Sequence, residues 1–275
     1  MSKCNVIAIS NQKGGVGKST TTVNLGVALA TQQGKKVLLV DGDPQGDLTC
    51  CLGWQDQDEL DVTLATMMEK AIECEQFDPT EGILHHSEGV DLMPANIELS
   101  AMEMLLVTTM SREYTMRQWL NKVKPAYDYV LIDCMPSLGM ITINALTAAD
   151  QVIIPVQSHY LPAKGMNQLI KTVNKVKRQV NPKLRIGGIL LTLVDSRTKL
   201  AQNMSDDIRA NYSKQFHIFA TEIPMAISAA ETSMTGKSLF DYDPKSKVAQ
   251  AYAALAEEVV EHGKELAKAK AGISR

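Results

Sequence analysis

A glycine-rich loop, Asn11-Gln12-Lys13-Gly14-Gly15-Val16-Gly17-Lys18-Ser19-Thr20, is the strongest structural signal in this 275-residue chain. It follows a short apolar run that predicts a strand, and a helical pattern begins at Lys18. In this position backbone N–H groups point into the loop and the helix N-terminus adds positive charge. The segment therefore predicts a phosphate-binding loop (P-loop) inside an α/β fold.

Each residue type in the loop has a physical task. Glycines allow the tight turn, Lys18 is expected against the β- and γ-phosphates, and the Ser19 hydroxyl is expected to bind Mg²⁺. The residues predicted to bind the nucleotide are Gly14, Gly15, Val16, Gly17, Lys18, Ser19 and Thr20.

The loop departs from the ordinary pattern G-x-x-x-x-G-K-[ST]. Gln12 replaces the first glycine, and an additional lysine, Lys13, precedes the paired glycines. A second ammonium group at the phosphates would compensate γ-phosphate charge. The alternative is an ordinary exposed loop lysine.

Carboxylates follow two apolar strand patterns. Asp41 and Asp43 end the run that begins at Val37, and Asp133 ends Tyr129–Ile132 in the Walker B form. Ligands in open α/β sheets bind at the carboxyl ends of strands, so these acids are expected beside the P-loop. Asp133 is predicted to hold Mg²⁺ directly or through water. For Asp41 or Asp43 the alternative is a cap of the following turn.

Apolar runs alternate with helical patterns along the chain, which predicts a doubly wound, mostly parallel sheet with helices on both faces, as one domain over residues 1–275. The predicted strands are Asn5–Ser10, Lys36–Asp41, Val90–Pro94, Tyr127–Asp133, Gln151–Val156, Arg185–Leu193 and Phe216–Ile223. The predicted helices are Lys18–Gln33, Leu60–Glu75, Glu113–Lys122, Gly139–Ala148, Ala163–Gln179, Leu200–Ser213 and Lys247–Lys268. A polar, acidic surface excursion is expected at Asp56–Glu88.

Composition excludes several classes of protein. No apolar run approaches the roughly 18 residues of a membrane span, and Val6–Ile9 leads into polar residues and glycine rather than a cleavage site. Five cysteines without a C-x-x-C pair indicate reduced thiols. A cytoplasmic protein is expected.

Charge is unevenly distributed although the net charge is only −3. Residues 41–113 hold 17 Asp and Glu against two basic residues, whereas residues 164–214 hold 11 Lys and Arg against three Asp. The basic segment predicts a face that meets a polyanion. Solvated helix faces are the alternative.

The pattern K-G-G-x-G-K-[ST] resembles the deviant Walker A motif of the ParA/MinD class of P-loop ATPases, and the resemblance runs from Asn5 to about Val259. Asp41-Gly42-Asp43-Pro44-Gln45-Gly46 is similar to the motif on that family's second strand. Asn144-Ala145-Leu146, Ile154-Pro155-Val156-Gln157 and the run Leu191–Thr198 resemble ParA/Soj partition ATPases. Met135 departs from the D-x-P-P-S that usually follows Asp133.

The resemblance implies a Mg²⁺-dependent ATPase that forms a homodimer on binding ATP. It implies that Lys13 reaches the phosphates of the partner's ATP, that Asp43 orients the attacking water, and that Asp41 supports the metal site. ATP is favoured over GTP because the three Asn/Thr-Lys segments of the chain lack the Asp that reads guanine.

The resemblance further implies non-specific DNA binding in the ATP state, association with the nucleoid and a ParB-like, centromere-binding partner. The DNA-contact candidates are Arg197, Lys199, Arg209 and Lys214. No helix-turn-helix segment is expected before the first strand. The alternative is a MinD-like membrane-associated cell-division ATPase, which should end in an amphipathic helix. After Val260 only Leu266 and Ile273 are large and aliphatic, which favours the partition branch.

Overall fold

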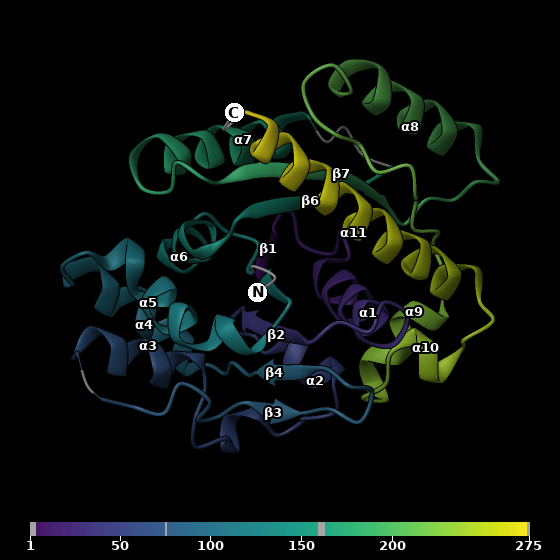
Figure 1. Ribbon diagram of the computed structural model, residues 1–275. Helices are drawn as coiled ribbons and strands as arrows, with labels where there is room; N and C mark the ends of the chain where they lie inside the picture. The colour runs from purple at the N-terminus through teal and green to yellow at the C-terminus, as the bar shows by residue number, and fades with distance from the viewer. Residues whose placement is uncertain (1–3, 75, 159–162, 274–275) are drawn as a thin grey trace.

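A seven-stranded sheet forms the centre of the computed structural model, which describes residues 4–74, 76–158 and 163–273 (Figure 1). The strand order is β3-β4-β2-β5-β1-β6-β7, and every neighbouring pair is parallel except β3 and β4. The strands are β1 (Asn5–Ile9), β2 (Val37–Gly42), β3 (Leu84–His85), β4 (Asp91–Met93), β5 (Tyr129–Cys134), β6 (Gln151–Gln157) and β7 (Arg185–Thr192). The predicted fold class is confirmed.

Helices connect the strands and cover both faces of the sheet. They are α1 (Lys18–Thr31), α2 (Asp47–Cys51), α3 (Leu64–Ile72), α4 (Glu98–Thr108), α5 (Thr115–Val123), α6 (Met140–Ala148), α7 (Ala163–Gln179), α8 (Lys199–Tyr212), α9 (Ser228–Glu231), α10 (Leu239–Tyr242) and α11 (Lys247–Ile273). Short 3₁₀ turns occur at Gln57–Glu59, Arg112–Tyr114, Lys124–Ala126 and Thr232–Met234. No described helix has the length and apolar character that crossing a membrane requires.

Two hydrophobic clusters form because successive strand residues point to opposite faces of the sheet. In β1, Val6 and Ala8 face the cluster that holds α3 to α7, whereas Ile7 and Ile9 face the cluster that holds α1 and α11. Figure 1 shows the first group of helices at the left and α1 with α11 at the right. Strands buried on both faces explain why their sequences are apolar without alternation.

One predicted strand is wrong. Residues 216–223 form no regular strand. Two isolated parallel bridges, Ile189–Ile218 and Val194–Pro224, and a few backbone hydrogen bonds, such as those from Phe219 to Ile189 and from Ile223 to Leu191, join the segment to β7 and the residues after it. Side chains bind other backbone groups of the segment. Glu258 accepts the N–H groups of Ala220 and Thr221 at 2.7 and 3.1 Å, and Arg209 donates to the carbonyl of Phe219 at 3.2 Å.

Helix α4 has no counterpart among the predicted helices. Its sequence, Glu98-Leu99-Ser100-Ala101-Met102-Glu103-Met104-Leu105-Leu106-Val107-Thr108, is apolar on most sides and carries little helical periodicity. The predicted helix Leu60–Glu75 is shorter, because α3 begins only at Leu64, after an extended Thr63. Glu75 itself lies outside the described residues.

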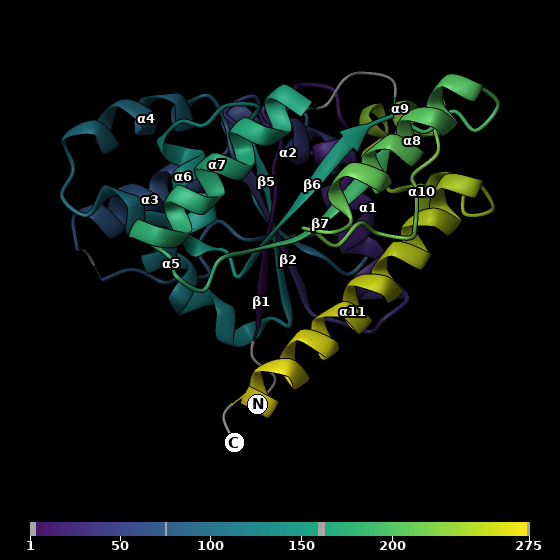
Figure 2. The same cartoon turned by 90° about the horizontal axis from the view of Figure 1, so that it is seen from above.

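The strand register brings the predicted acids to one edge of the sheet. Asp133 at the end of β5 pairs with Ile9 of β1 on one side and with Asp41 of β2 on the other. Because the P-loop follows β1 directly, this pairing places the carboxylates beside it, at the end of the sheet that lies uppermost in Figure 2.

Candidate nucleotide site

The P-loop adopts backbone angles that only glycine accepts easily. Gly15 and Gly17 have φ values of +68° and +80°, and α1 begins immediately afterwards at Lys18. A Cβ atom built at Gly14, Gly15 or Gly17 would meet no atom within 4 Å. The loop therefore wraps around open space, as a phosphate cradle must.

The loop opens into a cavity of about 520 Å³, large enough for a nucleotide. One wall comes from the P-loop, α2 and the carboxylate edge, and the other from β7 and the segment after residue 222. The lining residues are Gly14, Gly15, Gly17, Lys18, Ser19, Thr20, Asp43, Asp47, Cys50, Cys51, Pro136, Thr192, Leu193, Ile223, Pro224, Ala226, Ala229, Ala230, Ser233 and Tyr252.

Lys18 is the cation of this cavity. Its side chain is only 8% exposed, and its charge lowers the pKa values of both Asp43 and Asp133 against the rise that burial causes. Lys18 is therefore buried close enough to both carboxylates for its charge to act on them. Lys18 thus occupies the position from which an ammonium meets nucleotide phosphates.

Asp133 has the features of a magnesium ligand. Burial, with the nearby charge of Asp41, raises its pKa to about 8, and a hydrogen bond from Ser19 acts in the opposite direction. Its Oδ1 atom is buried and has no hydrogen-bond partner. A hydroxyl and an unsatisfied carboxylate oxygen at the phosphate cradle form an oxygen donor set that fits Mg²⁺.

Asp41 is completely buried and its oxygens are bound by the protein. Oδ2 accepts the N–H and the hydroxyl of Thr49 at 2.9 and 2.7 Å, and Oδ1 accepts the N–H of Asp43 at 3.1 Å. Burial raises its pKa to about 7. These contacts favour the supporting role that was predicted over direct metal binding, because they fix the turn that carries Asp43.

Asp43 lies just past the end of β2 and lines the cavity. Its Oδ1 atom accepts the N–H of Gln45 at 3.1 Å, and burial raises the pKa of the carboxyl group. Asp43 therefore reaches the space in front of Lys18, whereas Asp41 does not. Separate roles for the two acids stay a prediction.

Lys13 lies next to the cavity but is absent from the described residues that line it. Its side chain is exposed, and Nζ donates to Oε1 of Gln157 at 2.9 Å. Gln157 in turn donates to the carbonyl of Gly15 at 3.1 Å. Lys13 is therefore held at the outer rim of the loop, outside its own subunit's phosphate space.

The sequence analysis missed the second wall of the cavity. Leu193, a non-glycine residue with φ of +51°, follows β7, and Thr192 donates to the carbonyl of Val16 at 2.9 Å. Ile223 and Pro224 continue this wall. The only local signal was the run of small and apolar residues from Ile223 to Ala230, which carries no recognisable motif.

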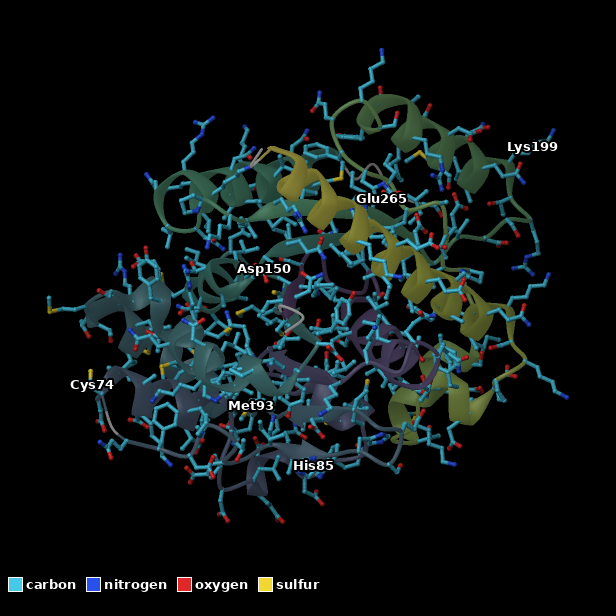
Figure 3. The ribbon with its side chains drawn as sticks, viewed as in Figure 1. Cys74, His85, Met93, Asp150, Lys199 and Glu265 are labelled. Carbon is cyan, nitrogen blue, oxygen red and sulfur yellow. The ribbon has the colours of Figure 1, made fainter. Side chains whose placement is uncertain are left out.

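The four DNA-contact candidates do not form one cluster. Arg197 is exposed but bound bidentately by Asp195 at 2.8 and 3.0 Å, and Arg209 is bound by Glu222 at 3.0 Å. Lys199 and Lys214 flank α8, roughly 20 Å apart along the helix axis. Figure 3 shows Lys199 at the periphery of the molecule.

Other basic residues share one exposed helix face. On α7, Lys171, Lys175 and Arg178 recur at helical spacing and line a surface hollow of about 320 Å³ with Asn174 and Gln179. The structure thus separates the predicted basic segment into the α7 face and the two ends of α8. Lys164, the first residue of that segment, has a side chain outside the described part of the chain.

Known proteins similar to this chain point to one family. A protein-family profile described as an AAA domain matches residues 4–186. The chain is 43% identical to the sporulation initiation inhibitor protein Soj of Bacillus subtilis over 258 residues, covering 94% of this chain and 99% of Soj. It is 39% identical to the chromosome partitioning protein ParA of Caulobacter vibrioides, with 93% of each chain covered.

Solved structures show the same fold. A cobyrinic acid a,c-diamide synthase from Mycobacterium smegmatis with bound ADP and magnesium has a TM-score of 0.82 and 38% identity, covering 95% of this chain and 96% of that one. A plasmid partition protein from Borrelia burgdorferi has a TM-score of 0.72 at 22% identity, covering 94% of this chain and 99% of that one.

Proposed function

This chain belongs to the ParA/Soj family of partition ATPases, and from that premise we propose that it hydrolyses ATP to ADP and phosphate in a dimer-forming cycle that segregates DNA. The observation that carries the proposal is a P-loop cavity with a second lysine, Lys13, at its outer rim. The cargo is a plasmid, a mobile element or a chromosome.

ATP or ADP occupies the cavity together with Mg²⁺. The P-loop amides and Lys18 bind the phosphates, and the Ser19 hydroxyl with the free Oδ1 atom of Asp133 holds the metal. The apolar wall of Leu193, Ile223 and Pro224 suits a purine base. Support comes from the M. smegmatis structures, which hold ADP or an ATP analogue with magnesium.

Asp43 orients the water that attacks the γ-phosphate. Its place at the open side of the cavity, past the end of β2, supports this role. Asp41 keeps the turn in place through its bonds to Thr49 and to the Asp43 amide. Hydrolysis thus depends on a carboxylate positioned by its neighbours on the chain.

ATP joins two copies of the chain face to face, and Lys13 of each copy leaves Gln157 for the phosphates of its partner. Lys13 is placed for this because its ammonium group stays outside its own cavity. Exposed apolar residues close to the cavity, Met225, Ile227 and Met234, supply surface that the association would bury.

The ATP-bound dimer binds DNA without sequence preference and so associates with the nucleoid in the cytoplasm. Dimerisation doubles the number of phosphate contacts, which strengthens binding through avidity. We place these contacts on the α7 face and at Lys199 and Lys214, because Arg197 and Arg209 are already paired with acids. A ParB-like protein stimulates hydrolysis and release.

One similar structure suggests a second candidate function, ATP-dependent amide synthesis, through its name. Enzymes that take ammonia from glutamine need an activated thiolate. Cys50 and Cys51 line the cavity, but burial and nearby acids raise both thiol pKa values, that of Cys51 to about 12. Similarity to Soj and ParA over nearly the whole chain favours the partition function.

The test measures retention of duplex DNA on filters at several salt concentrations, with ATP, with ADP and without nucleotide. We expect ATP-dependent retention that falls steeply as salt rises. Joint replacement of Lys171 and Lys175 by alanine should weaken it, whereas Lys36→Ala, at an exposed lysine before β2, should not. Equal retention with ATP and ADP would exclude the proposed switch.

A further inference from the structure

The P-loop is fixed to the two strands that follow β1 in the sheet order, β6 and β7 (Figure 1). Side chains continue the pairing of β1 with β6 beyond the end of β1. Asn11 donates to the carbonyl of Pro155 at 2.6 Å, and Lys13 donates to Gln157 at 2.9 Å. The first residues of the loop therefore follow β6 after the regular pairing of the strands has ended.

Two side chains at the ends of these strands bind the backbone of the loop itself. Gln157 is the last residue of β6 and Thr192 the last of β7, and the two are partners in the strand register. Gln157 donates to the carbonyl of Gly15 at 3.1 Å, and Thr192 donates to the carbonyl of Val16 at 2.9 Å. Two consecutive carbonyl groups of the loop are thus held by the sheet.

A bond to a carbonyl group also fixes the N–H group of the next residue. A peptide unit is planar and trans, so its N–H points in the direction opposite to its C=O. The N–H groups of Val16 and Gly17 therefore point away from the two side chains that hold the carbonyls. The positive φ angles of Gly15 and Gly17 belong to a turn in which successive N–H groups converge on an anion.

Apolar packing does not account for the hydroxyl of Thr192. This residue is 1% exposed and lines the cavity where its second wall meets the loop. Valine has nearly the same shape as threonine but carries no donor, so a valine could fill this space and could not hold the carbonyl of Val16. The bond to the loop is what the hydroxyl adds.

We propose that Gln157 and Thr192 are positioning residues of the nucleotide site, which orient the amides of Val16 and Gly17 before a phosphate arrives. This inference rests on the proposed nucleotide site and names the side chains that prepare it. A loop without these bonds would spend part of its time with the amides turned away. The apparent affinity for phosphate then falls in proportion to the binding-competent fraction.

The bond from Gln157 to the loop is separate from its contact with Lys13. Oε1 of Gln157 accepts the ammonium group of Lys13, whereas Nε2 donates to the carbonyl of Gly15. The bond to Gly15 can therefore persist when Lys13 moves to the phosphates of another subunit. Gln157 orients the loop in the single chain and in the dimer alike.

The binding test uses two probes, ADP with Mg²⁺ and inorganic pyrophosphate, in titration calorimetry. Thr192→Val should weaken the binding of both probes by at least about fivefold, because both depend on the same loop amides. Thr192→Ser keeps the hydroxyl and should restore most of the affinity. Thr147→Val is the matched control: it removes a buried bond from Thr147 to the carbonyl of Ile143 at 2.7 Å and should leave both affinities unchanged.

A second pair of variants tests the other side chain. Gln157→Met keeps the length of the side chain but removes its donor, and it should weaken the binding of both probes by at least about threefold. Gln202→Met removes a comparable bond on α8, from Gln202 to the carbonyl of Ser196 at 2.8 Å, and should bind both probes like the parent protein. Gln157→Met decides the question if Thr192→Val does not fold.

Hydrogen exchange followed by mass spectrometry reports on the loop without any nucleotide. The peptide that contains residues 11–20 should exchange at least about threefold faster in Thr192→Val than in the parent protein, because the loop has lost one of its bonds to the sheet. Thr147→Val should leave the exchange of this peptide unchanged. Thermal unfolding of the same samples separates a looser loop from a less stable fold.

The outcomes distinguish this inference from the proposed function. A parent protein that binds neither ADP nor pyrophosphate would overturn the nucleotide site and the inference with it. If the parent protein binds both probes, undiminished pyrophosphate affinity in Thr192→Val overturns the inference alone. An equal loss of affinity in Thr192→Ser, or unaltered exchange of the loop in Thr192→Val, also overturns it.

Discussion

Two buried carboxylates on adjacent strands explain the chemistry of the site at the scale of single residues. Asp41 and Asp133 are paired across β2 and β5, and burial raises both pKa values. The charge of Lys18 offsets part of the repulsion between these two carboxylates. A divalent cation next to the free oxygen of Asp133 would offset the rest, so nucleotide with Mg²⁺ should stabilise the folded chain.

Lys18→Ala should weaken ATP binding strongly. Charge-assisted hydrogen bonds to phosphate are each worth about 1.5–3 kcal/mol, so affinity should fall by at least tenfold to a hundredfold. Titration calorimetry with ATP and Mg²⁺ measures the change. Lys36→Ala, which changes an exposed lysine before β2, is the matched control, and wild-type affinity in Lys18→Ala would contradict the assignment.

Asp43→Ala should retain ATP and lose its hydrolysis. Water activation by a side chain contributes about 10²–10⁴-fold, so the turnover rate should fall by at least a hundredfold while ATP affinity changes little. Phosphate release with DNA present measures the rate. Asp47→Ala removes another carboxylate from the same cavity and should remain active; a fully active Asp43→Ala would refute the role.

Sequence spacing located these residues because the P-loop and the strand-ending carboxylates are local signals. It could not identify Leu193 or Pro224, because their place in the cavity depends on the packing of β7 against a segment with no motif. Nor could it show that Asp195 and Glu222 pair with Arg197 and Arg209. Such pairs depend on which side chains the folded chain brings together.

At the scale of elements, Thr49 connects three parts of the chain around Asp41. Its hydroxyl donates to Asp41 at 2.7 Å and accepts the N–H of Ala95 at 3.2 Å, and its own N–H donates to Asp41. The short helix α2 is therefore fixed to β2 and to the segment after β4. This arrangement keeps the turn that carries Asp43 in place.

Thr49→Val should destabilise the protein by about 1–3 kcal/mol, because it removes one of the two donors to Oδ2 of Asp41 and leaves the amide of Ala95 without its acceptor. Urea denaturation monitored by circular dichroism measures the loss. Thr49→Ser, which keeps the hydroxyl, should recover most of the stability. A stability equal to the parent in Thr49→Val would show that the hydroxyl contributes nothing.

The two misjudged elements, residues 216–223 and α4, show what periodicity leaves out. The apolar residues of 216–223 suggested a strand, yet Glu258 and Arg209 bind part of its backbone and only isolated bridges join it to the sheet. Helix α4 carries apolar residues on both its buried and its exposed side, so its sequence shows no helical period. An unbroken apolar run, β2, and an amphipathic helix, α7, were predicted closely.

At the scale of the whole molecule, sheet order separates the two charged segments. The acidic residues 41–113 accompany β4 and β3 at one edge of the sheet, and the basic residues 164–214 accompany β7 at the other (Figure 1). The P-loop lies between them after β1. The β7 edge can therefore attract a polyanion, although the net charge is small.

Association of two copies should require Lys13. In the single chain its ammonium group is bound to Gln157 beside the loop, so a partner's phosphates must offer a better site for it to move. Lys13→Ala should bind ATP with an affinity within a few-fold of the parent, yet remain a monomer at saturating ATP. Sedimentation velocity with ATP and Mg²⁺, using Asp43→Ala as a background that retains ATP, measures this.

Lys35→Ala, which changes a lysine just before β2, should dimerise normally. A Lys13→Ala protein that dimerises like its background would place this lysine outside the interface and leave association to the apolar surface near the cavity.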